Sequence, residues 1–435
     1  MTASVRRWGG LGAALAVVAL AATGCLRDAT GGEHGPLAGH TVEVAAIWTG
    51  AEQANFEAVL DAFEERTGAT VRYTAGGDDL PALLNSRLAG GSPPDVALVG
   101  QPGVVTQLAH RGVLAELTGE AAGAVAANFS PPWRELGVVD GTLYGVYYKV
   151  ANKSVIWYRT DAFDEAGVGP VATWEELLGI TRTLADAGVG TMAVPGADGW
   201  VLTDWFENIY LRVAGPDRYD QLARHEIPWT HPSVVESLRL LQEFWTLDRA
   251  IQSDPGQLKF VQAVADVFGQ LPKSAMLFEA DFVAAEIHRL GTVAVGDGAR
   301  FFDWPSIDGS PPAVVTAGDQ AVALTDRPAA MALVAYLASP DAAAIAAAQG
   351  GFLSANRNLD SAAYPDPVTR ELADSLLTAE QLRFDLSDLT PQAFGGGTHA
   401  SMWRLLQDFL VNPGDPAALA QRLELAAQHD MGTGR

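Results

Sequence analysis

Short apolar runs alternate with amphipathic stretches along the first part of the chain. The run TVEVAAIW at 41–48 is typical of a strand, and apolar side chains then recur at helical spacing over 56–63. A strand-like run at 70–73, a helical stretch at 80–88 and a fully apolar run at 95–99 follow. Strands that alternate with helices predict right-handed βαβ units and a largely parallel sheet.

The same alternation continues further along the chain. Strand-like runs occupy 146–150 and 154–158, and Thr173-Trp-Glu-Glu176 has the sequence of a capping box that begins a helix reaching about Gly188. Further helices are expected over 201–245, interrupted at Gly215-Pro216 and Ile227-Pro228, and over 401–410 and 416–428. With 435 residues the chain is too long for a single compact core, so two lobes are expected.

The N-terminal residues have the pattern of an export signal. Arg6 and Arg7 precede an apolar run over 11–22, which is too short to span a bilayer, so residues 1–24 are predicted to be a signal peptide. Cys25 closes the segment Ala-Thr-Gly-Cys, which resembles a bacterial lipobox except that Ala22 stands where leucine is usual. We expect Cys25 to be lipidated and residues 25–39 to form a flexible tether at the outer face of the bacterial cytoplasmic membrane. The alternatives are a free cysteine after an ordinary signal and twin-arginine instead of Sec export.

The charge and the composition narrow the classes of function. A formal net charge of −24 argues against nucleic acid or anionic lipid as a partner, and it suits a neutral ligand better than an anionic one. The single cysteine rules out a disulfide within the chain. It also argues against a thiolate metal site, because such sites need several cysteine ligands. The eight histidines are scattered, and no nucleotide-binding loop or serine-hydrolase elbow is present. We therefore expect no metal and no cofactor.

Four groups of segments follow one another along nearly the whole chain after residue 39. They are Arg66-Thr-Gly68 with Ser92-Pro-Pro-Asp-Val96, Tyr144-Gly-Val146 with 155–177, Lys273-Ser-Ala-Met276 with Phe282, and Ala317-Gly-Asp319 with Ser339-Pro340 and Gly350-Gly351. Taken in order, these segments resemble the sugar-type extracellular solute-binding proteins of ABC importers, the family of maltose-binding protein. The chain departs from the family pattern at Ala280 and Phe282, where glycine and tryptophan are usual.

The resemblance implies a two-lobed α/β clamp of the periplasmic-binding-protein type, in which each lobe holds a mainly parallel sheet flanked by helices. The ligand would sit in a cleft at the hinge, and hinge closure around it would be read by the transporter. By the matching segments, lobe 1 holds 40–148 plus 309–350 and lobe 2 holds 153–303 plus 355–430. The hinge crossings are placed at 149–152, 304–308 and 351–354.

Sugar recognition needs aromatic faces for the C–H-rich sides of the ring and polar groups for its hydroxyls. Aromatic, acidic and amide side chains near predicted strand ends, hinge crossings and family motifs meet that need. For Trp48 and Glu52 the competing interpretation is packing within the lobe and stabilisation of a helix N-terminus. The candidate ligand-binding residues are Trp48, Glu52, Gln53, Gln101, Tyr148, Asn152, Trp200, Glu279, Asp281, Phe282, Asp319 and Phe394.

The sequence therefore predicts a monomeric binding protein, not an enzyme, that captures a mono- or oligosaccharide and delivers it to ABC-transporter permease subunits. Two alternatives remain open. One is a lipid-anchored carbohydrate hydrolase with two catalytic carboxylates, which could be present among the 52 acidic residues. The other is the same clamp with a peptide or a polyamine as ligand.

Overall fold

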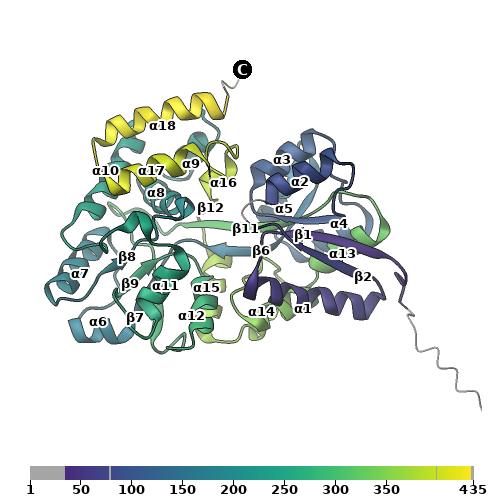
Figure 1. Cartoon of the computed structure of the whole chain (residues 1–435), viewed down its shortest axis with the longest axis horizontal. Helices are drawn as coiled ribbons and strands as arrows, with labels where there is room; N and C mark the ends of the chain where they lie inside the picture. Colours follow the sequence, from purple (N-terminus) through teal and green to yellow (C-terminus); the bar gives the residue numbers. More distant parts are fainter. Residues whose placement is uncertain (1–34, 78–79, 398, 433–435) are drawn as a thin grey trace, which may run out of the picture.

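The computed structural model describes residues 35–77, 80–397 and 399–432. The predicted signal peptide, the lipidation site Cys25 and the first part of the tether lie outside these residues. Two sheets, each covered by helices, form two lobes that are joined near the middle of the molecule by strands β6 and β11 (Figure 1). We call the lobe around the six-stranded sheet the first lobe and the lobe around the four-stranded sheet the second lobe.

The first lobe is built on a sheet with the strand order β12-β11-β3-β1-β2, in which β6 also pairs with β11. Strand β3 has four apolar residues that are all buried, which places it at the centre of the sheet. The strands are β1 (Thr41–Ala46), β2 (Thr70–Ala75), β3 (Val96–Val99), β6 (Gly145–Asn152), β11 (Val314–Ala323) and β12 (Leu382–Phe384). A separate two-stranded sheet joins β4 (Val138–Val139) and β5 (Thr142–Leu143).

The second lobe is built on a four-stranded sheet with the order β10-β7-β9-β8. Its central strand β7 carries apolar residues that pack against helices on the faces of the sheet. The strands are β7 (Val155–Arg159), β8 (Met192–Ala193), β9 (Met276–Phe278) and β10 (Ala299–Asp303).

The direction of the strands differs in part from the prediction of two mainly parallel sheets. Strand β1 is parallel to both β2 and β3, as the βαβ pattern predicted. In the second lobe only β8 and β9 are parallel, whereas β7 is antiparallel to both β9 and β10. The two-lobed α/β clamp is confirmed, but both sheets are mixed because the strands that leave one lobe and return to it run in opposite directions.

The helices agree closely with the apolar spacing in the sequence. The predicted capping box is present: the Thr173 hydroxyl accepts from the backbone N–H of Glu176, and the Glu176 carboxylate accepts from that of Thr173. In the first lobe the helices are α1 (Gly50–Thr67), α2 (Leu80–Ala89), α3 (Pro102–His110), α4 (Gly119–Asn128), α5 (Pro131–Glu135), α13 (Pro328–Leu337) and α14 (Pro340–Gln349).

The remaining helices pack on or beside the second lobe. The predicted breaks at Gly215-Pro216 and Ile227-Pro228 fall between successive helices. These elements are α6 (Thr160–Ala166), α7 (Trp174–Asp186), α8 (Gly199–Ala214), α9 (Pro216–Ala223), α10 (Pro232–Thr246), η2 (Pro255–Gln257), α11 (Phe260–Phe268), α12 (Val283–Leu290), η3 (Ser361–Ala363), α15 (Pro367–Thr378), α16 (Leu386–Leu389), α17 (Ser401–Val411) and α18 (Pro416–Asp430).

The chain passes between the sheets through β6 and β7 and returns through β10 and β11. Strand β6 pairs along its length with β11 of the first sheet, and β7 then joins the second sheet. The segment predicted to be the third crossing lies beside β6, because Leu353 forms a bridge with Val150. The ends of both sheets therefore lie around these segments. We call this region between the two sheets the seam.

Helix length and hydropathy give one further fact about the described residues. No single helix there is long and apolar enough to cross a membrane. Helices α13 and α14 together pass the same test, but their axes differ by 61° at the break between them.

Candidate functional site

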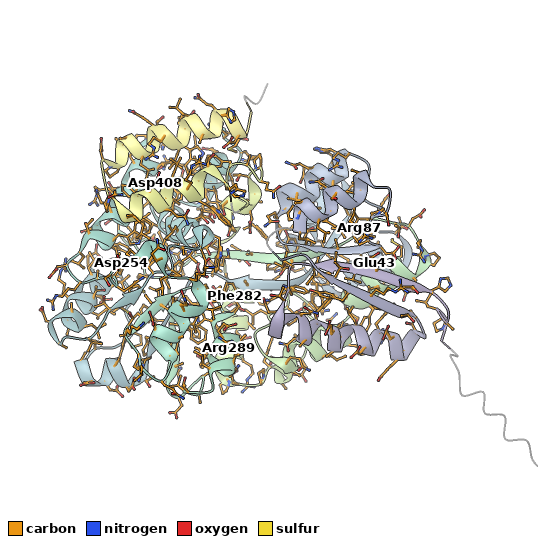
Figure 2. All side chains as sticks on the ribbon, viewed as in Figure 1. Glu43, Arg87, Asp254, Phe282, Arg289 and Asp408 are labelled. Carbon is orange, nitrogen blue, oxygen red and sulfur yellow. The ribbon has the colours of Figure 1, made fainter. Side chains whose placement is uncertain are left out.

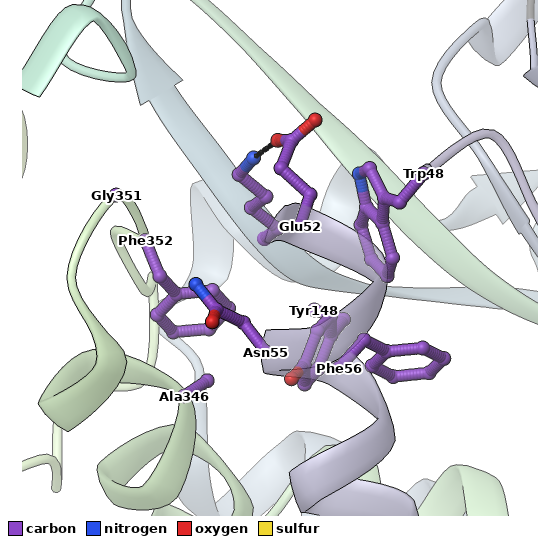
Figure 3. Close-up of a pocket in the computed structure, with 9 residues that line it drawn as sticks. Trp48, Glu52, Asn55, Phe56, Tyr148, Ala346, Gly351 and Phe352 are labelled. Atoms are coloured by element: carbon purple, nitrogen blue, oxygen red, sulfur yellow. Dashed lines mark hydrogen bonds and ion pairs between the residues drawn. The ribbon is translucent and has the colours of Figure 1, made fainter. Parts of the chain in front are cut away.

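A small hollow opens in the first lobe next to the crossing segments, beside the end of β1 and the first turns of α1 (Figure 3). The empty space in and around it, including the part open to solvent, is about 290 Å³. Residues from β6 and from the segment after α14 complete its wall. The lining residues are Trp48, Glu52, Asn55, Phe56, Tyr148, Lys149, Ala346, Gly351 and Phe352.

Packed aromatic rings form the inner wall of this hollow. The ring centroids of Trp48 and Phe56 lie 4.9 Å apart, and those of Tyr148 and Phe352 lie 5.2 Å apart. Trp48 and Tyr148 are 4% and 3% exposed, so only an edge of each can meet a ligand. The competing interpretation of Trp48, packing within its own lobe, therefore describes most of its surface.

The amino group of Lys149 is the positive charge that pairs with the acidic side chains of the hollow. It is bonded to the carboxylate of Glu52, and it lies 5.8 Å from the centroid of the Trp48 ring. Burial by itself would lower the pKa of Lys149, but the negative charges of Glu52 and Asp319 raise it. Lys149 is therefore a protonated cation whose partner Glu52 keeps 45% of its side chain exposed.

Two carboxyl groups near Lys149 are buried and have raised pKa values. Burial raises the pKa of Asp281 to about 7 and that of Asp319 to about 6, against the opposing influence of the Lys149 charge. Asp281 comes from the second lobe and accepts a 2.6 Å hydrogen bond from the backbone N–H of Asn152, whereas Asp319 lies on β11. Carboxyl groups from both sides of the seam thus share one lysine.

A second lysine, Lys153, lies just beyond β6 in a fully enclosed group of acids. Its amino group is 2.6 Å from a carboxylate oxygen of Asp385 and 3.0 Å from one of Asp204. Burial would raise the pKa of Asp385, but the charge and the hydrogen bond of Lys153 lower it to about 2. Burial raises the pKa of Asp204 well above its usual value. One cation cannot offset two buried carboxylates equally, so Asp385 is ionised and Asp204 holds a proton more readily.

Glu207 extends the Lys153 group towards α16. Its carboxylate accepts hydrogen bonds of 2.7 Å and 2.9 Å from the backbone N–H groups of Leu386 and Ser387 at the start of that helix. Carboxylate oxygens of Asp204, Glu207 and Asp385 lie within 4.8 Å of one another, a spacing that a cation could use. The amino group of Lys153 already supplies positive charge there, so these residues are not suited to hold a metal as well.

Aromatic side chains and a buried acid, whose Oε2 accepts a 3.0 Å hydrogen bond from the backbone N–H of Ala280, lie on the second-lobe side of the seam. Trp200 contacts Phe282 and Phe260 with ring centroids 5.9 Å and 5.5 Å away, and its ring lies 5.7 Å from the Lys153 amino group. Figure 2 shows Phe282 near the strands that join the lobes. Burial raises the pKa of Glu279 to about 7, and its Oε1 has no hydrogen-bond partner among the described residues. The Oδ2 atom of Asp204 also has no hydrogen-bond partner among the described residues, and Asp204 influences the pKa of Glu279.

The structure brings most of the predicted ligand-binding residues to this seam. Trp48, Glu52 and Tyr148 line the hollow, and Asp281 and Asp319 flank Lys149. Trp200, Glu279 and Phe282 form the second-lobe side described above. Gln101 lies at the start of α3, close to Gly396 of the second lobe. A Cβ built on Gly396 would lie 3.4 Å from the Cγ atom of Gln101.

Three predicted residues have other surroundings. The Gln53 amide donates a 2.8 Å hydrogen bond to Glu57 on the same helix. Asn152 is fully buried in the crossing, where its side-chain oxygen accepts from the backbone N–H of Ser154. The Phe394 ring is fully buried in the second-lobe core, 5.1 Å from that of Trp229. The glycines after Phe394 suggested a loop close to a ligand, but the ring packs inward because it fills a large apolar space.

Sequence reasoning missed the residues that organise the charges, namely Lys149, Lys153, Asp204 and Asp385. One signal was available: the chain has only four lysines, and two of them bracket the predicted first crossing. No comparable signal marked Asp385, which is 232 positions from Lys153 in the sequence.

Comparison with known proteins agrees with this arrangement. The family model described as bacterial extracellular solute-binding protein matches residues 48–344. The osmoprotective compounds-binding protein GgtB of Synechocystis sp. is 33% identical over 381 residues, which cover 85% of this chain and 88% of that protein. The alpha-glucosides-binding periplasmic protein AglE of Rhizobium meliloti is 31% identical over 393 residues, which cover 86% and 84% of the two chains.

Solved structures show the same fold at lower identity. The bacterial solute receptor AcbH, described as having an exclusive preference for β-D-galactopyranose, aligns with a TM-score of 0.78 and 19% identity over 90% of this chain and 99% of its own. The GacH receptor of Streptomyces glaucescens, also solved with acarbose, aligns with a TM-score of 0.73 and 15% identity over 91% and 99%.

Proposed function

Because the chain belongs to the family of bacterial extracellular solute-binding proteins, we propose that it captures a carbohydrate outside the cytoplasm and delivers it to an ABC-transporter permease. Its relatives in Synechocystis and Rhizobium, which are named for osmoprotective compounds and alpha-glucosides, match most of its length. Alpha-glucosides are therefore the first class of ligand to test.

The observation that carries the proposal is the pairing of aromatic faces with carboxyl groups on both sides of the seam. Trp48 with Glu52 and Asp319 lies on the first-lobe side, and Trp200 with Glu279 lies on the second-lobe side. Aromatic faces suit the apolar sides of a sugar ring, and carboxyl oxygens accept from its hydroxyls more strongly than neutral groups do. A sugar at the seam would bind both lobes at once.

We infer that ligand binding favours a closed clamp. The crossings at 149–152, 304–308 and 351–354 are the proposed hinges between the lobes; within the range 355–430 expected for lobe 2, β12 pairs with β11 and so belongs to the first sheet. A ligand that contacts both lobes binds the closed form better, so it shifts the population towards that form. The permease would then distinguish loaded from empty protein by the relative position of the lobes.

The proposal includes attachment to the membrane through a lipid on Cys25. The lipobox-like segment and the Gly-rich residues after it support this part. A Cys25→Ser variant should be exported without lipid and should bind the same ligand, since the cysteine precedes both predicted lobes in the sequence. Loss of binding in that variant would contradict the role of Cys25 as an anchor. We expect the anchored protein to be a monomer, which size-exclusion chromatography with light scattering tests.

A thermal-shift screen of residues 26–435 tests the carbohydrate. The panel holds alpha-glucosides, other neutral sugars, glycine betaine, short peptides and the polyamines putrescine and spermidine. A ligand at about 100 times its Kd should stabilise the fold by about 2.7 kcal/mol. A shift with peptides or polyamines and none with sugars would overturn the proposal.

Recovery of the bound ligand separates transport from catalysis. After release by denaturation, the sugar should have the same mass and linkage as the sugar supplied. A hydrolysed product would favour the alternative of a carbohydrate hydrolase over a binding protein.

A further inference from the structure

We infer that α3 and residues 386–397, which we call the latch segment, come into contact when the two lobes close. Gly103 on α3 then controls ligand affinity from outside the hollow beside Trp48. The inference rests on the proposed function and adds the residues that position the lobes. Figure 1 shows α16, which begins the latch segment, on the side of the second lobe nearest to α3.

Helix α3 is fixed to the first lobe. Its residues Val104, Val105 and Leu108 are buried in one core cluster with Leu80 and Leu84 of α2. The helix also follows β3, the central strand of the first sheet, after only two residues. A helix that is closely packed in the core of a lobe moves with that lobe, so α3 follows the first lobe in any hinge motion.

The latch segment is fixed to the second lobe. Glu207 on α8 accepts from the backbone N–H groups of Leu386 and Ser387, and the buried Phe394 ring belongs to the second-lobe core. Strand β12 ends just before the latch segment and pairs with β11 of the first sheet. The chain therefore passes from the first sheet to the second lobe at Asp385, and the latch segment follows the second lobe.

The two elements meet at Gly103, the second residue of α3. A Cβ built there would lie 2.8 Å from the carbonyl oxygen of Thr390, which is closer than real Cβ atoms approach a backbone oxygen. Gln392 of the latch segment also lines a small pocket whose other residues come from α2, α3 and Arg111. Among the described residues no hydrogen bond or ion pair joins α3 to the latch segment, so the contact depends on close packing.

A contact of this kind can form and separate repeatedly. Its separation breaks no hydrogen bond or ion pair between the lobes, whereas the packing on each side keeps α3 and the latch segment in their own lobes. The contact stabilises the closed form alone, so it favours closure and thereby increases the affinity for a ligand that binds both lobes. Glycine is needed at position 103 because a side chain there would hold the lobes apart.

A Gly103→Ala variant of residues 26–435 tests this role in binding. Calorimetric titration with maltose, trehalose and sucrose, all of which are alpha-glucosides, gives the affinity. The added methyl group should weaken binding of the sugar that the parent binds by about tenfold, because the closed form must separate α3 from Thr390. Most of the loss should appear as faster release of the sugar, which stopped-flow fluorescence measures.

The controls separate closure from folding and from the proposed function. Alanine is a better helix former than glycine, so the ligand-free variant should unfold at or above the temperature of the parent. Gly123→Ala on α4 is the matched control, since its Cβ would meet nothing within 4 Å. Unchanged affinity in Gly103→Ala would overturn the latch. Absence of binding by the parent would instead count against alpha-glucosides, and the next experiment, which needs no ligand, would then decide the latch.

A Gln101→Cys, Gly396→Cys double variant tests the contact without a ligand. A Cβ on Gly396 would lie 3.4 Å from the Cγ atom of Gln101, so two cysteines are well placed to form a disulfide there. Residues 26–435 contain no other cysteine. In small-angle X-ray scattering without sugar, the oxidised protein should have a smaller radius of gyration than the same protein after reduction, because the disulfide holds the lobes closed.

The comparison is made within one variant, so loss of the Gln101 side chain affects both states equally. Equal radii of gyration in the oxidised and reduced states would show that α3 and the latch segment stay together without ligand, which would overturn the latch. Failure of the two cysteines to join under oxidation would also overturn it, since the contact would then not form in solution.

Discussion

Lys149 and Lys153 lie close together in the sequence, yet their charged groups have different surroundings. Lys149 lies at the edge of the hollow and pairs with Glu52, whose carboxylate is 45% exposed. Lys153 is enclosed between Asp204 and Asp385, which are 0% and 2% exposed. The solvent access of the partner decides the role. An exposed partner can exchange the lysine for water or ligand, whereas buried partners depend on it to remain in the protein interior.

The backbone around Lys153 supports the same distinction. The N–H of Lys153 donates to Val315 on β11, and its carbonyl oxygen accepts from the Asn208 amide on α8. Asp385 also accepts from the N–H of Asp388, so its carboxylate fixes the start of α16. Lys153 thus links the crossing between lobes to the helix that meets α3. We propose a structural role for Lys153 and a role in ligand binding for Lys149.

The largest expected effect is on folding stability in a Lys153→Met variant. Removing the cation leaves two buried carboxyl groups without compensation, which should lower the free energy of unfolding by about 3–5 kcal/mol. Denaturant unfolding at pH 7 measures this change. Lys273→Met is the control, because the Lys273 side chain is 70% exposed and its loss should stay within about 0.5 kcal/mol. Equal losses in Lys153→Met and Lys273→Met would contradict the structural role of Lys153.

The next effect is on ligand affinity in a Lys149→Met variant. Loss of the charge beside Trp48 should weaken binding of the preferred sugar by about 10- to 100-fold, equivalent to about 1.4–2.7 kcal/mol. Stability should fall less than in Lys153→Met, because water can reach Glu52. Calorimetric titration gives the affinity and thermal unfolding gives the stability. Unchanged affinity in a folded Lys149→Met protein would assign both lysines to structure.

A smaller effect should appear in the dependence of stability on pH. The pKa values of Asp281 and Asp319 are raised to about 7 and about 6, above the value of about 3.9 in an unfolded chain. Their contribution to stability is present below about pH 4 and is lost as the pH rises through 6 and 7. The pKa of Asp385 is lowered to about 2, so its contribution is lost as the pH falls from about 4 towards 2.

Melting temperatures between pH 5 and pH 8 should therefore decline in the parent protein and decline less in an Asp281→Asn, Asp319→Asn double variant. Asparagine preserves the oxygen that accepts from Asn152 and removes the titration. An equal decline in both proteins would show that the Lys149 group does not control this dependence.

The smallest effect should follow from a Glu52→Gln change. An ion pair with a half-exposed partner contributes about 0–1 kcal/mol, so the melting temperature should change little. Affinity should fall by severalfold at most, since the amide still offers an oxygen to a hydroxyl. A loss of stability as large as that in Lys153→Met would mean that Glu52 belongs to the structural group.

The sequence by itself determined the local elements of this protein. Apolar spacing, the capping box at Thr173 and the Gly-Pro break at 215–216 located strands and helices correctly, because these signals act between residues that are neighbours in the chain. Apolar periodicity also placed the first strands in parallel pairs. The family segments added the two-lobed architecture, which local patterns alone do not specify.

Only the tertiary structure decided which side chains meet and what each is available to do. Lys153 and Asp385 come together from distant parts of the chain. The Phe394 side chain packs in the second-lobe core, although the glycines that follow it in the sequence suggested a loop close to a ligand. The strand directions in the second sheet depend on how the chain crosses between lobes. Each of these outcomes depends on burial and on contacts of long sequence separation. Local sequence specifies the conformation of a segment, whereas the packing of distant segments fixes the solvent access and the charge of its side chains.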